Sequence, residues 1–502
     1  MAPHKNIVLL IADDLGREQM SCYGCKALST PRLDELAKSG SRFDLAFAST
    51  ASCSGSRTTL YTGLHTHNNG CYGLAGGTNG FQTFPDIETL PEVFNDIGYL
   101  TGILGKIHVA PDNKYPWQVR KHSESRDVAH IADLAADFMK DAKAQDKPFC
   151  LTVGYIDPHR VLGERGGFGN VEGNYDARLK DRVFAPAEVE VPSFLSDLPE
   201  VRQELCEYYR SINRMDQGVG MILDNIASLG LTESTLVVFL SDNGPPFINS
   251  KTTLYDAGVR LPLLMRVPGR QADILNLNMV SWTDMLPTFL DWAGYPGRQP
   301  AEGQPRLGRS ILPIVDQASA EPGWDRVFGS HTFHEITNYW PTRYLRDRRL
   351  KYHRNVCWRL DFPFAMDLYA SLSFEGMRNA APAMVGQRKL KDYIFRPAEE
   401  LYDLENDPAE VKNLAGEEAW QGKLKEMRSA LEEWQTATQD LWLWRDGTSV
   451  YRYRQHGYFR EGLRIPDRFD FNADEPGNKD DVIGSVELDL RRVAPDFAEY
   501  RG

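Results

Sequence analysis

Four short apolar segments that each end in polar residues constrain the fold of this chain most strongly. Residues 7–12 are continuously apolar, which is typical of a parallel strand buried on both faces. Asp13 and Asp14 follow this first segment. The other three are residues 101–105 before Lys106 and His108, residues 149–156 before Asp157-Pro158-His159, and residues 236–240 before Ser241-Asp242-Asn243-Gly244. In open parallel sheets, the loops beyond the carboxyl ends of the strands build the functional site.

Helical stretches separate these apolar segments. One is expected to begin after Thr30 as N-cap with Pro31 at its first position, and to end before Gly40. Longer helices are expected over residues 127–142 and 201–229. Alternation of strands and helices predicts an α/β domain in which helices cover the sheet.

The later part of the sequence changes character. Residues 343–352 indicate a hairpin, and residues 400–404 indicate another short strand that ends at Asn406-Asp407-Pro408. A helix is expected from about residue 417 to 438. A chain of 502 residues suits a large domain with a smaller one. We therefore predict a catalytic domain over residues 1–320, followed by a small antiparallel-sheet domain over residues 321–502 whose last sixty residues form an irregular tail.

Charge and cysteine usage limit the function. The net charge is −13, with 57 basic and 70 acidic side chains, so a general nucleic-acid binder is not expected. Seven scattered cysteines do not predict a disulfide framework, and Cys22-x-x-Cys25 lacks the second pair of a zinc site, so we expect a loop there. No apolar run is long enough to span a membrane. No signal peptide is visible, so we expect a cytoplasmic protein or one whose leader was removed.

The acidic strand ends predict a metal site. Asp13, Asp14, Asp242 and Asn243 offer only oxygen donors, and such a set suits a hard divalent cation rather than zinc. Calcium is favoured over magnesium, because several protein oxygens leave few positions for the waters that magnesium retains. The alternative for either pair alone is a solvated turn or a helix cap.

Residues 53–63 place a thiol just before a short helix that is expected to begin at Ser56. Unpaired backbone N–H groups at a helix start favour bound anions and thiolates, so Cys53 is a candidate nucleophile. The alternative is a small buried cysteine. Positive charge and proton donors for an anionic tetrahedral group come from Arg57, Lys106, His108, His159 and Lys251.

Together these segments resemble the sulfatases of the alkaline-phosphatase-like superfamily. The resemblance extends along nearly the whole chain and includes Ala12-Asp13-Asp14, residues 30–34, residues 53–63, residues 104–108, Asp157-Pro158-His159 and residues 241–244. It implies a large mixed sheet flanked by helices. Within the family, the chain is similar to the heparan N-sulfatases, or sulfamidases, at residues 157–160, 214–220, 253–255, 334–335 and 362–364.

The resemblance also implies roles for individual residues. Asp13, Asp14, Asp242 and Asn243 would bind calcium, and formylglycine made from Cys53 would complete the site. Arg57 and Lys106 would hold the hydrated aldehyde, with His108 as its base. His159 and Lys251 would contact the sulfate, and His159 would protonate the leaving group. His334 and Glu335 are assigned to substrate binding.

The implied activity is hydrolysis of a sulfate group, with the N-sulfate of a glucosamine-type sugar as the leading substrate. The alternatives are an O-sulfatase, a phosphonate or phosphate monoester hydrolase, and a non-catalytic binder of sulfated glycans if Cys53 is not converted. Expected partners are a sulfated sugar and the formylglycine-generating enzyme, with a homodimer as a candidate assembly and no nucleic acid or membrane. Three departures from the family pattern are Gly55 in place of proline, Lys251 in place of arginine, and residues 73–80 without histidines.

Overall fold

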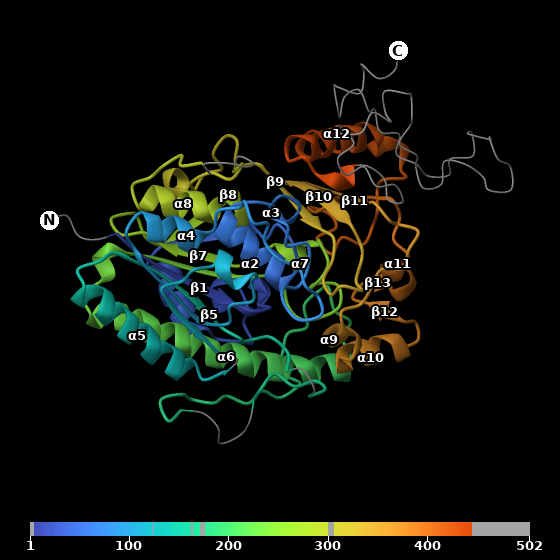
Figure 1. Ribbon diagram of the computed structural model, residues 1–502. Helices are drawn as coiled ribbons and strands as arrows, with labels where there is room; N and C mark the ends of the chain where they lie inside the picture. The colour runs from blue at the N-terminus through green and yellow to red at the C-terminus, as the bar shows by residue number, and fades with distance from the viewer. Residues whose placement is uncertain (1–4, 124, 162–163, 171–175, 300–305, 444–502) are drawn as a thin grey trace, which may run out of the picture.

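The computed structural model describes residues 5–123, 125–161, 164–170, 176–299 and 306–443. Within these ranges, the largest element is an eight-stranded mixed sheet with the order β4-β3-β5-β1-β6-β7-β2-β8 (Figure 1). Its strands are β1 (Asn6–Ala12), β2 (Ser41–Phe47), β3 (Leu100–Gly105), β4 (Val119–His122), β5 (Phe149–Gly154), β6 (Thr235–Ser241), β7 (Leu263–Arg266) and β8 (Ile274–Ser281). Strand β7 runs antiparallel to both of its neighbours, and the other pairs are parallel. The predicted α/β class with a large mixed sheet is confirmed.

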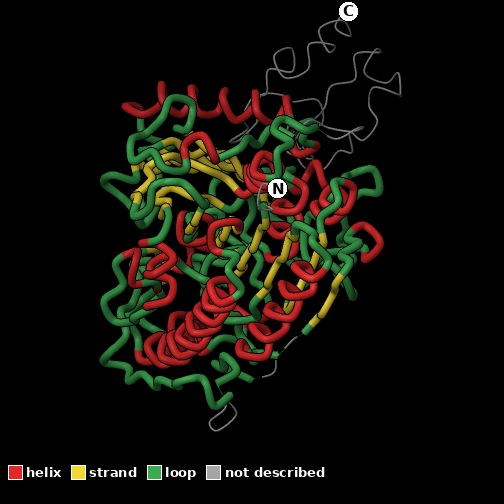
Figure 2. The backbone as a smooth tube through the Cα atoms, turned by 90° about the vertical axis from the view of Figure 1, so that its left-hand side faces the viewer, coloured by secondary structure: helices red, strands yellow, loops and turns green. Residues whose placement is uncertain are grey.

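Strand β1 shows why its sequence is continuously apolar. Val8 and Leu10 pack on one face of the sheet, in a cluster with α1 (Pro31–Lys38), α5 (Val128–Ala144) and α6 (Pro199–Ser228). Ile7, Leu9 and Ile11 pack on the opposite face, in a cluster with α2 (Cys53–Thr62), α4 (Leu90–Asp96) and α8 (Met285–Trp292). Figure 2 shows the strands running between helices. Each such side chain contributes about 1.5–3 kcal/mol when buried.

A second, antiparallel sheet has the order β14-β11-β10-β9 and is covered by α12. Its strands are β9 (Arg326–His331), β10 (Thr342–Asp347), β11 (Leu350–Asn355) and β14 (Glu399–Asp403), and α12 spans Gln421–Ala437. The predicted hairpin, strand and late helix are therefore present. The smaller elements are α3 (Thr66–Asn69), α7 (Asp256–Val259), α9 (Met366–Tyr369), α10 (Leu372–Asn379), α11 (Leu390–Ile394), β12 (Met384–Val385) and β13 (Arg388–Lys389).

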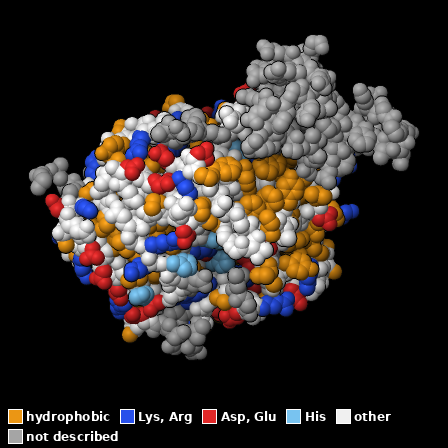
Figure 3. All heavy atoms as spheres, in the orientation of Figure 1, with side chains coloured by type: hydrophobic (Ala, Val, Ile, Leu, Met, Phe, Trp, Pro, Cys, Tyr) orange, Lys and Arg blue, Asp and Glu red, His pale blue; other side chains and the backbone are white. Residues whose placement is uncertain are grey.

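The stretch between β11 and β14 packs against α6, on the side of the large sheet, and also contacts β14 of the small sheet through Arg388 and Tyr402. Phe362 and Tyr393 belong to the hydrophobic cluster that contains α6, and Trp340 joins them. Figure 3 shows hydrophobic side chains gathered on the right-hand side of the molecule, where these later elements lie. The boundary near residue 320 stays a prediction, and the predicted irregular tail lies largely outside the described residues.

Helix α1 starts where the sequence predicts, but its free N–H groups are capped by a distant side chain. Thr30 makes no side-chain cap, and its hydroxyl instead accepts from the Ser21 backbone N–H at 3.1 Å. The capping oxygens come from Asp216 on α6, which accepts from the backbone N–H of Leu33 at 2.8 Å and of Arg32 at 3.3 Å. Thr30 is therefore the N-cap residue and Pro31 the first helical residue, as expected, but a carboxylate from another helix accepts from the free N–H groups. In the described ranges, no helix combines the length and apolar character needed to cross a bilayer.

Candidate active site

The acidic residues predicted at two strand ends do meet. Strands β1 and β6 are neighbours with Ala12 opposite Ser241, so their carboxyl ends bring Asp13, Asp14, Asp242 and Asn243 together. All four side chains are fully buried. Asp242 Oδ1 accepts from the backbone N–H of Asp14 at 3.1 Å and of Asn243 at 2.8 Å, while the Asn243 side-chain amide donates to Asp14 Oδ1 at 2.6 Å.

Two oxygens of this cluster are buried without a hydrogen-bond partner among the described residues, namely Asp13 Oδ1 and Asn243 Oδ1. Burial, together with neighbouring carboxylates, raises the pKa of Asp14 to about 6 and that of Asp242 to about 7. A binding site for a hard cation requires oxygen atoms without hydrogen-bond partners that lie among several carboxylates. The donor set therefore fits the calcium ion expected from the sequence.

Cys53 lies directly against this cluster. Its Sγ is 4.0 Å from Asp14 Oδ1, and ligand atoms of Asp13, Cys53 and Asp242 lie within 4.8 Å of one another. The helix that carries it, α2, begins at Cys53 with Ser52 as N-cap, so the expected start at Ser56 was three residues late. The expected thiolate is also wrong. Burial raises the Cys53 pKa well above its ordinary value, and the positive charges of Lys106 and Lys251 counter this only in part.

Two buried cations hold the acids in place. Arg57 is fully buried, and its Nε donates to Asp242 Oδ2 at 2.9 Å. Its Nη2 is 3.7 Å from Asp13 Oδ1 and has no hydrogen-bond partner in the described structure. Lys106 donates to Asp13 Oδ2. Burial works to raise the Asp13 pKa, but the charges of Lys106 and Arg57 help to hold it well below its usual range.

Lys251 uses all three of its ammonium protons. Its Nζ lies 2.9 Å from Asp14 Oδ2, 2.9 Å from Asp367 Oδ2 and 3.1 Å from His159 Nε2. His159 Nδ1 lies 2.6 Å from the Arg160 carbonyl oxygen, which can only accept, so Nδ1 carries the ring proton. His159 Nε2 is therefore free to accept from Lys251. Burial and the Lys251 charge lower the His159 pKa to about 3, in agreement with a neutral ring.

A cavity of about 580 Å³ opens above this cluster. Eight of the residues predicted from sequence line it, namely Asp13, Cys53, Lys106, His108, His159, Lys251, His334 and Glu335. The other four, Asp14, Arg57, Asp242 and Asn243, are not among its lining residues and are fully buried. The His334 ring Nδ1 is 3.0 Å from the hydroxyl of Ser52, next to Cys53. The structure thus brings all twelve predicted residues into one region.

The family model described as Sulfatase matches residues 5–295 of this chain, which is more than half of its length. This protein belongs to the sulfatase family. Its relatives include human N-sulphoglucosamine sulphohydrolase, which is 36% identical over 466 residues, 88% of this chain and 91% of that protein. An ulvan-active sulfatase of Formosa agariphila is 30% identical, over 87% of this chain and 81% of that protein. The protein is accordingly a hydrolase of sulfuric esters or sulfamates, from a family that generally uses a metal ion and formylglycine.

Solved structures confirm the alkaline-phosphatase-like fold of this sulfatase. A protein solved in complex with its substrate D-glucosamine-2-N,6-O-disulfate aligns with a TM-score of 0.61 at 20% identity, covering 87% of this chain and 98% of that one. A protein from glycosaminoglycan metabolism in Bacteroides thetaiotaomicron aligns with a TM-score of 0.66 at 16% identity, covering 88% of this chain and 98% of that one.

Two residues of the sulfatase site were missed by sequence reasoning. Asp367, on α9, lines the cavity and binds Lys251. Arg126 also lines it, donating to Asp157 Oδ1 at 2.5 Å and to the His159 carbonyl at 2.7 Å. Neither residue belongs to a recognisable sequence motif. The one available indication was that Asp367 follows shortly after residues 362–364, a segment that resembles the sulfamidases. Asp157 itself is buried and accepts from Arg214 at 2.7 Å, which makes it a support for the His159 segment.

Backbone strain also concentrates at the site. Asp14 and His108 adopt the left-handed region, with φ of 69° and 51°. Such conformations are costly for residues other than glycine and persist where the surrounding structure enforces them. They orient the two side chains toward the shared cluster and cavity.

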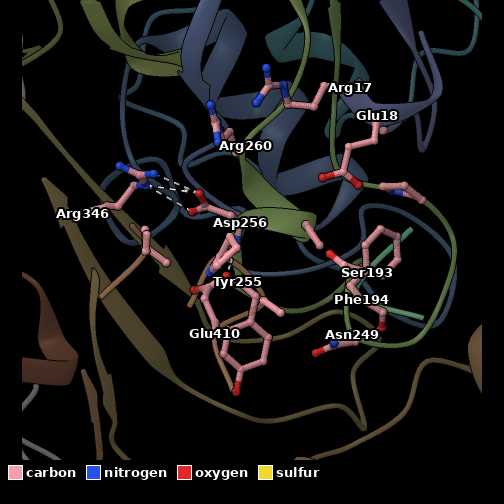
Figure 4. Close-up of a pocket in the computed structure, with 16 residues that line it drawn as sticks. Arg17, Glu18, Ser193, Phe194, Asn249, Tyr255, Asp256, Arg260, Arg346 and Glu410 are labelled. Atoms are coloured by element: carbon pink, nitrogen blue, oxygen red, sulfur yellow. Dashed lines mark hydrogen bonds and ion pairs between the residues drawn. The ribbon is translucent and has the colours of Figure 1, made fainter. Parts of the chain in front are cut away.

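A second cavity, of about 130 Å³, lies away from the predicted residues (Figure 4). Its wall carries Glu18, Asn249 and Glu410, and its charged groups include the Arg346–Asp256 ion pair at 3.1 Å. Arg17 and Arg260 are both paired with Asp44. None of the twelve predicted residues lines it, so the larger cavity is the candidate active site.

Proposed function

We propose that this sulfatase hydrolyses the N-sulfate of a glucosamine-type sugar, with calcium and with formylglycine derived from Cys53. The observation that carries the proposal is the 36% identity to human N-sulphoglucosamine sulphohydrolase, which extends over nearly the full length of both chains. The site supports it, because buried acids, cations and a cysteine surround one cavity.

The residues that would hold the metal are Asp13, Asp14, Asp242 and Asn243, with the group at position 53 beside them. A bound calcium ion would neutralise charge on the sulfate oxygens, and formylglycine would supply a hydrated aldehyde as the nucleophile. Conversion of Cys53 needs the formylglycine-generating enzyme as a maturation partner. The raised pKa of the unconverted thiol supports this requirement, since a neutral buried thiol is a poor nucleophile.

The chain's own groups have separate tasks in this proposal. Lys106 and Lys251 line the cavity and present positive charge to the sulfate. Arg57 holds Asp242 in position through its Nε–H hydrogen bond. His108 lines the cavity from beyond β3, whose carboxyl end lies at the same edge of the sheet as those of β1 and β6, and it serves as the base for the group at position 53. His159 is oriented by its Nδ1–H bond to the Arg160 carbonyl, so its Nε2 accepts from Lys251, and the Lys251 ammonium group would supply the proton that Nε2 passes to the leaving group.

A comparison of sugars tests the proposal. Protein made together with the formylglycine-generating enzyme should release sulfate from glucosamine N-sulfate faster than from glucosamine 6-O-sulfate. Cys53→Ala should abolish turnover, whereas Cys206→Ala, which removes another buried thiol on α6, should retain it. No turnover of the N-sulfated sugar by fully converted protein would refute the proposed substrate.

An O-sulfatase is the second candidate. The 30% identity to an ulvan-active sulfatase favours it over the phosphonate hydrolase and the non-catalytic binder. The same assay separates these possibilities, because an O-sulfatase would prefer the 6-O-sulfated sugar. A phosphonate hydrolase would prefer an aryl phosphonate over an aryl sulfate.

A further inference from the structure

Asp367 gives the cavity a carboxylate beside its sulfate-binding lysine. Its Oδ2 accepts from Lys251 Nζ at 2.9 Å, and Lys251 in turn lies 3.1 Å from His159 Nε2, the atom assigned to protonate the leaving group. Asp367 Oδ1 has no hydrogen-bond partner among the described residues, and it is not one of the buried unpartnered atoms. One oxygen of Asp367 is therefore engaged, and the other is open to the cavity that the residue lines.

The segment that carries Asp367 is held firmly. Glu335 Oε1 accepts from the backbone N–H of Met366 at 3.3 Å, and the Asn338 side chain donates to the Phe364 carbonyl at 3.2 Å. The Phe364 ring packs on those of Tyr369 and Phe374, with centroids 5.9 and 4.9 Å away. These contacts fix α9, so the carboxylate of Asp367 is preorganised.

Two arginines on the cavity wall are engaged by other groups. Arg126 donates to Asp157 and to the His159 carbonyl, and Arg160 makes a two-pronged ion pair with Glu204. The acids that line the cavity in the described chain are Asp13, Glu335 and Asp367, and Asp13 belongs to the metal cluster. Glu335 and Asp367 are therefore the cavity-lining carboxylates, within the described chain, that lie outside the metal cluster.

A nearby carboxylate affects nitrogen and oxygen leaving groups in opposite directions. The nitrogen of a sulfamate must take a proton before it leaves, so positive charge develops on it. An ester oxygen develops negative charge as its bond to sulfur breaks. A fixed anion beside the leaving atom therefore stabilises the first transition state and destabilises the second.

We propose that Asp367 is a specificity-determining residue that favours an amine leaving group over an alcohol or phenol. The inference rests on the proposed N-sulfatase function. In the step concerned, sulfur would form a bond to a hydroxyl oxygen of the hydrated aldehyde at position 53, whose proton passes to His108, while the S–N bond breaks and its electron pair stays on nitrogen. The nitrogen takes its proton from Lys251 by way of His159 Nε2. The sulfuryl group remains on the Cys53 side, and the free amine then takes a further proton from water to become an ammonium group that Asp367 Oδ1 can accept from.

The first test compares two substrates. Asp367→Asn should lower kcat/KM for glucosamine N-sulfate relative to 4-nitrophenyl sulfate by about tenfold. Asp367→Glu should restore part of this ratio, and Asp392→Asn, an exposed acid on α11, should leave it unchanged. An equal loss on both substrates would mean that Asp367 only positions Lys251, and would overturn the proposal.

The second test needs no formylglycine. Protein with Cys53→Ala should bind glucosamine, whose ammonium group is charged, several-fold more tightly than glucose in calorimetry with calcium present. Adding Asp367→Asn should remove this preference. Equal binding of the two sugars before that change would overturn the inference. If the wild-type enzyme released sulfate faster from the 6-O-sulfated sugar than from the N-sulfated one, the proposed function would be refuted. The binding comparison between glucosamine and glucose would still test the role of Asp367.

Discussion

Arg160 gives the sharpest test of the packing beneath the site. Its Nη1 and Nη2 each lie 2.7 Å from an oxygen of Glu204 on α6, and both side chains are buried. The guanidinium also lies over the rings of Phe168 and Phe247, 4.9 and 4.7 Å from their centroids. Glu204 further accepts from the first backbone N–H groups of α10, including that of Leu372 at 2.9 Å. One pair thus joins the His159 segment, α6 and α10.

Arg160→Met should lower the free energy of unfolding by about 3–5 kcal/mol, because it leaves a buried carboxylate without its counter-charge. The double variant Arg160→Met/Glu204→Gln removes that charge while an amide oxygen can still accept from α10. It should recover about 2 kcal/mol of the loss. Urea unfolding monitored by fluorescence measures both values. The reasoning is refuted if the double variant is no more stable than Arg160→Met alone.

The same pair predicts a dependence on pH. Burial works to raise the Glu204 pKa, but Arg160 holds it below its ordinary value of 4.5. The pair therefore stabilises the native protein above about pH 4.5, and this contribution is lost as pH falls through the lower native pKa. Without Arg160 the native Glu204 pKa moves upward. The stability gap between wild type and Arg160→Met should accordingly narrow as pH is lowered from 7 to 5.

Three further predictions follow from the sequence departures, the metal cluster and the α1 cap. Gly55→Pro should raise the fraction of Cys53 converted to formylglycine, measured by peptide mass spectrometry, at a small cost in stability because a Cβ at position 55 lies 3.1 Å from Thr50 Cγ2. If the converted fraction of Cys53 did not change, Gly55 would be excluded as a cause of poor conversion. Calcium at about 100 times its Kd should stabilise the protein by about 2.7 kcal/mol relative to chelator-treated protein in calorimetry, and no shift would argue against the cluster as its site. Burial raises the Asp216 pKa to about 7, so its contribution is greatest below pH 4 and declines as pH rises through 7. Asp216→Asn should lack that decline in unfolding experiments between pH 5 and 8, and parallel curves for the two proteins would contradict it.

The sequence allowed the position of the metal cluster to be predicted because the relevant information is local. An apolar run sets where β1 and β6 end, and the residues that follow must then lie at the same edge of the sheet. Residues that reach the site through tertiary packing carry no such signal. Asp367 lies on a four-residue helix whose backbone donates a hydrogen bond to Glu335. The residues next to Asp367 in the sequence give no indication of its contact with Lys251.

Local rules failed where a distant group replaced a local one. Thr30 has the sequence of an N-cap, but Asp216 from α6 caps α1 instead. Helix-start rules placed the beginning of α2 at Ser56, whereas the helix extends back to Cys53 and buries it. The setting of that thiol was misjudged because the elements that bury Cys53 come from distant parts of the chain, and residues 53–63 alone do not reveal that burial.

The two halves of the pocket have separate origins in the chain. Its floor is built from strand ends before residue 260, and the wall that bears Glu335 and Asp367 comes from residues more than seventy positions later. Mutations in the later segment can thus change substrate selectivity while the catalytic residues of the floor stay the same.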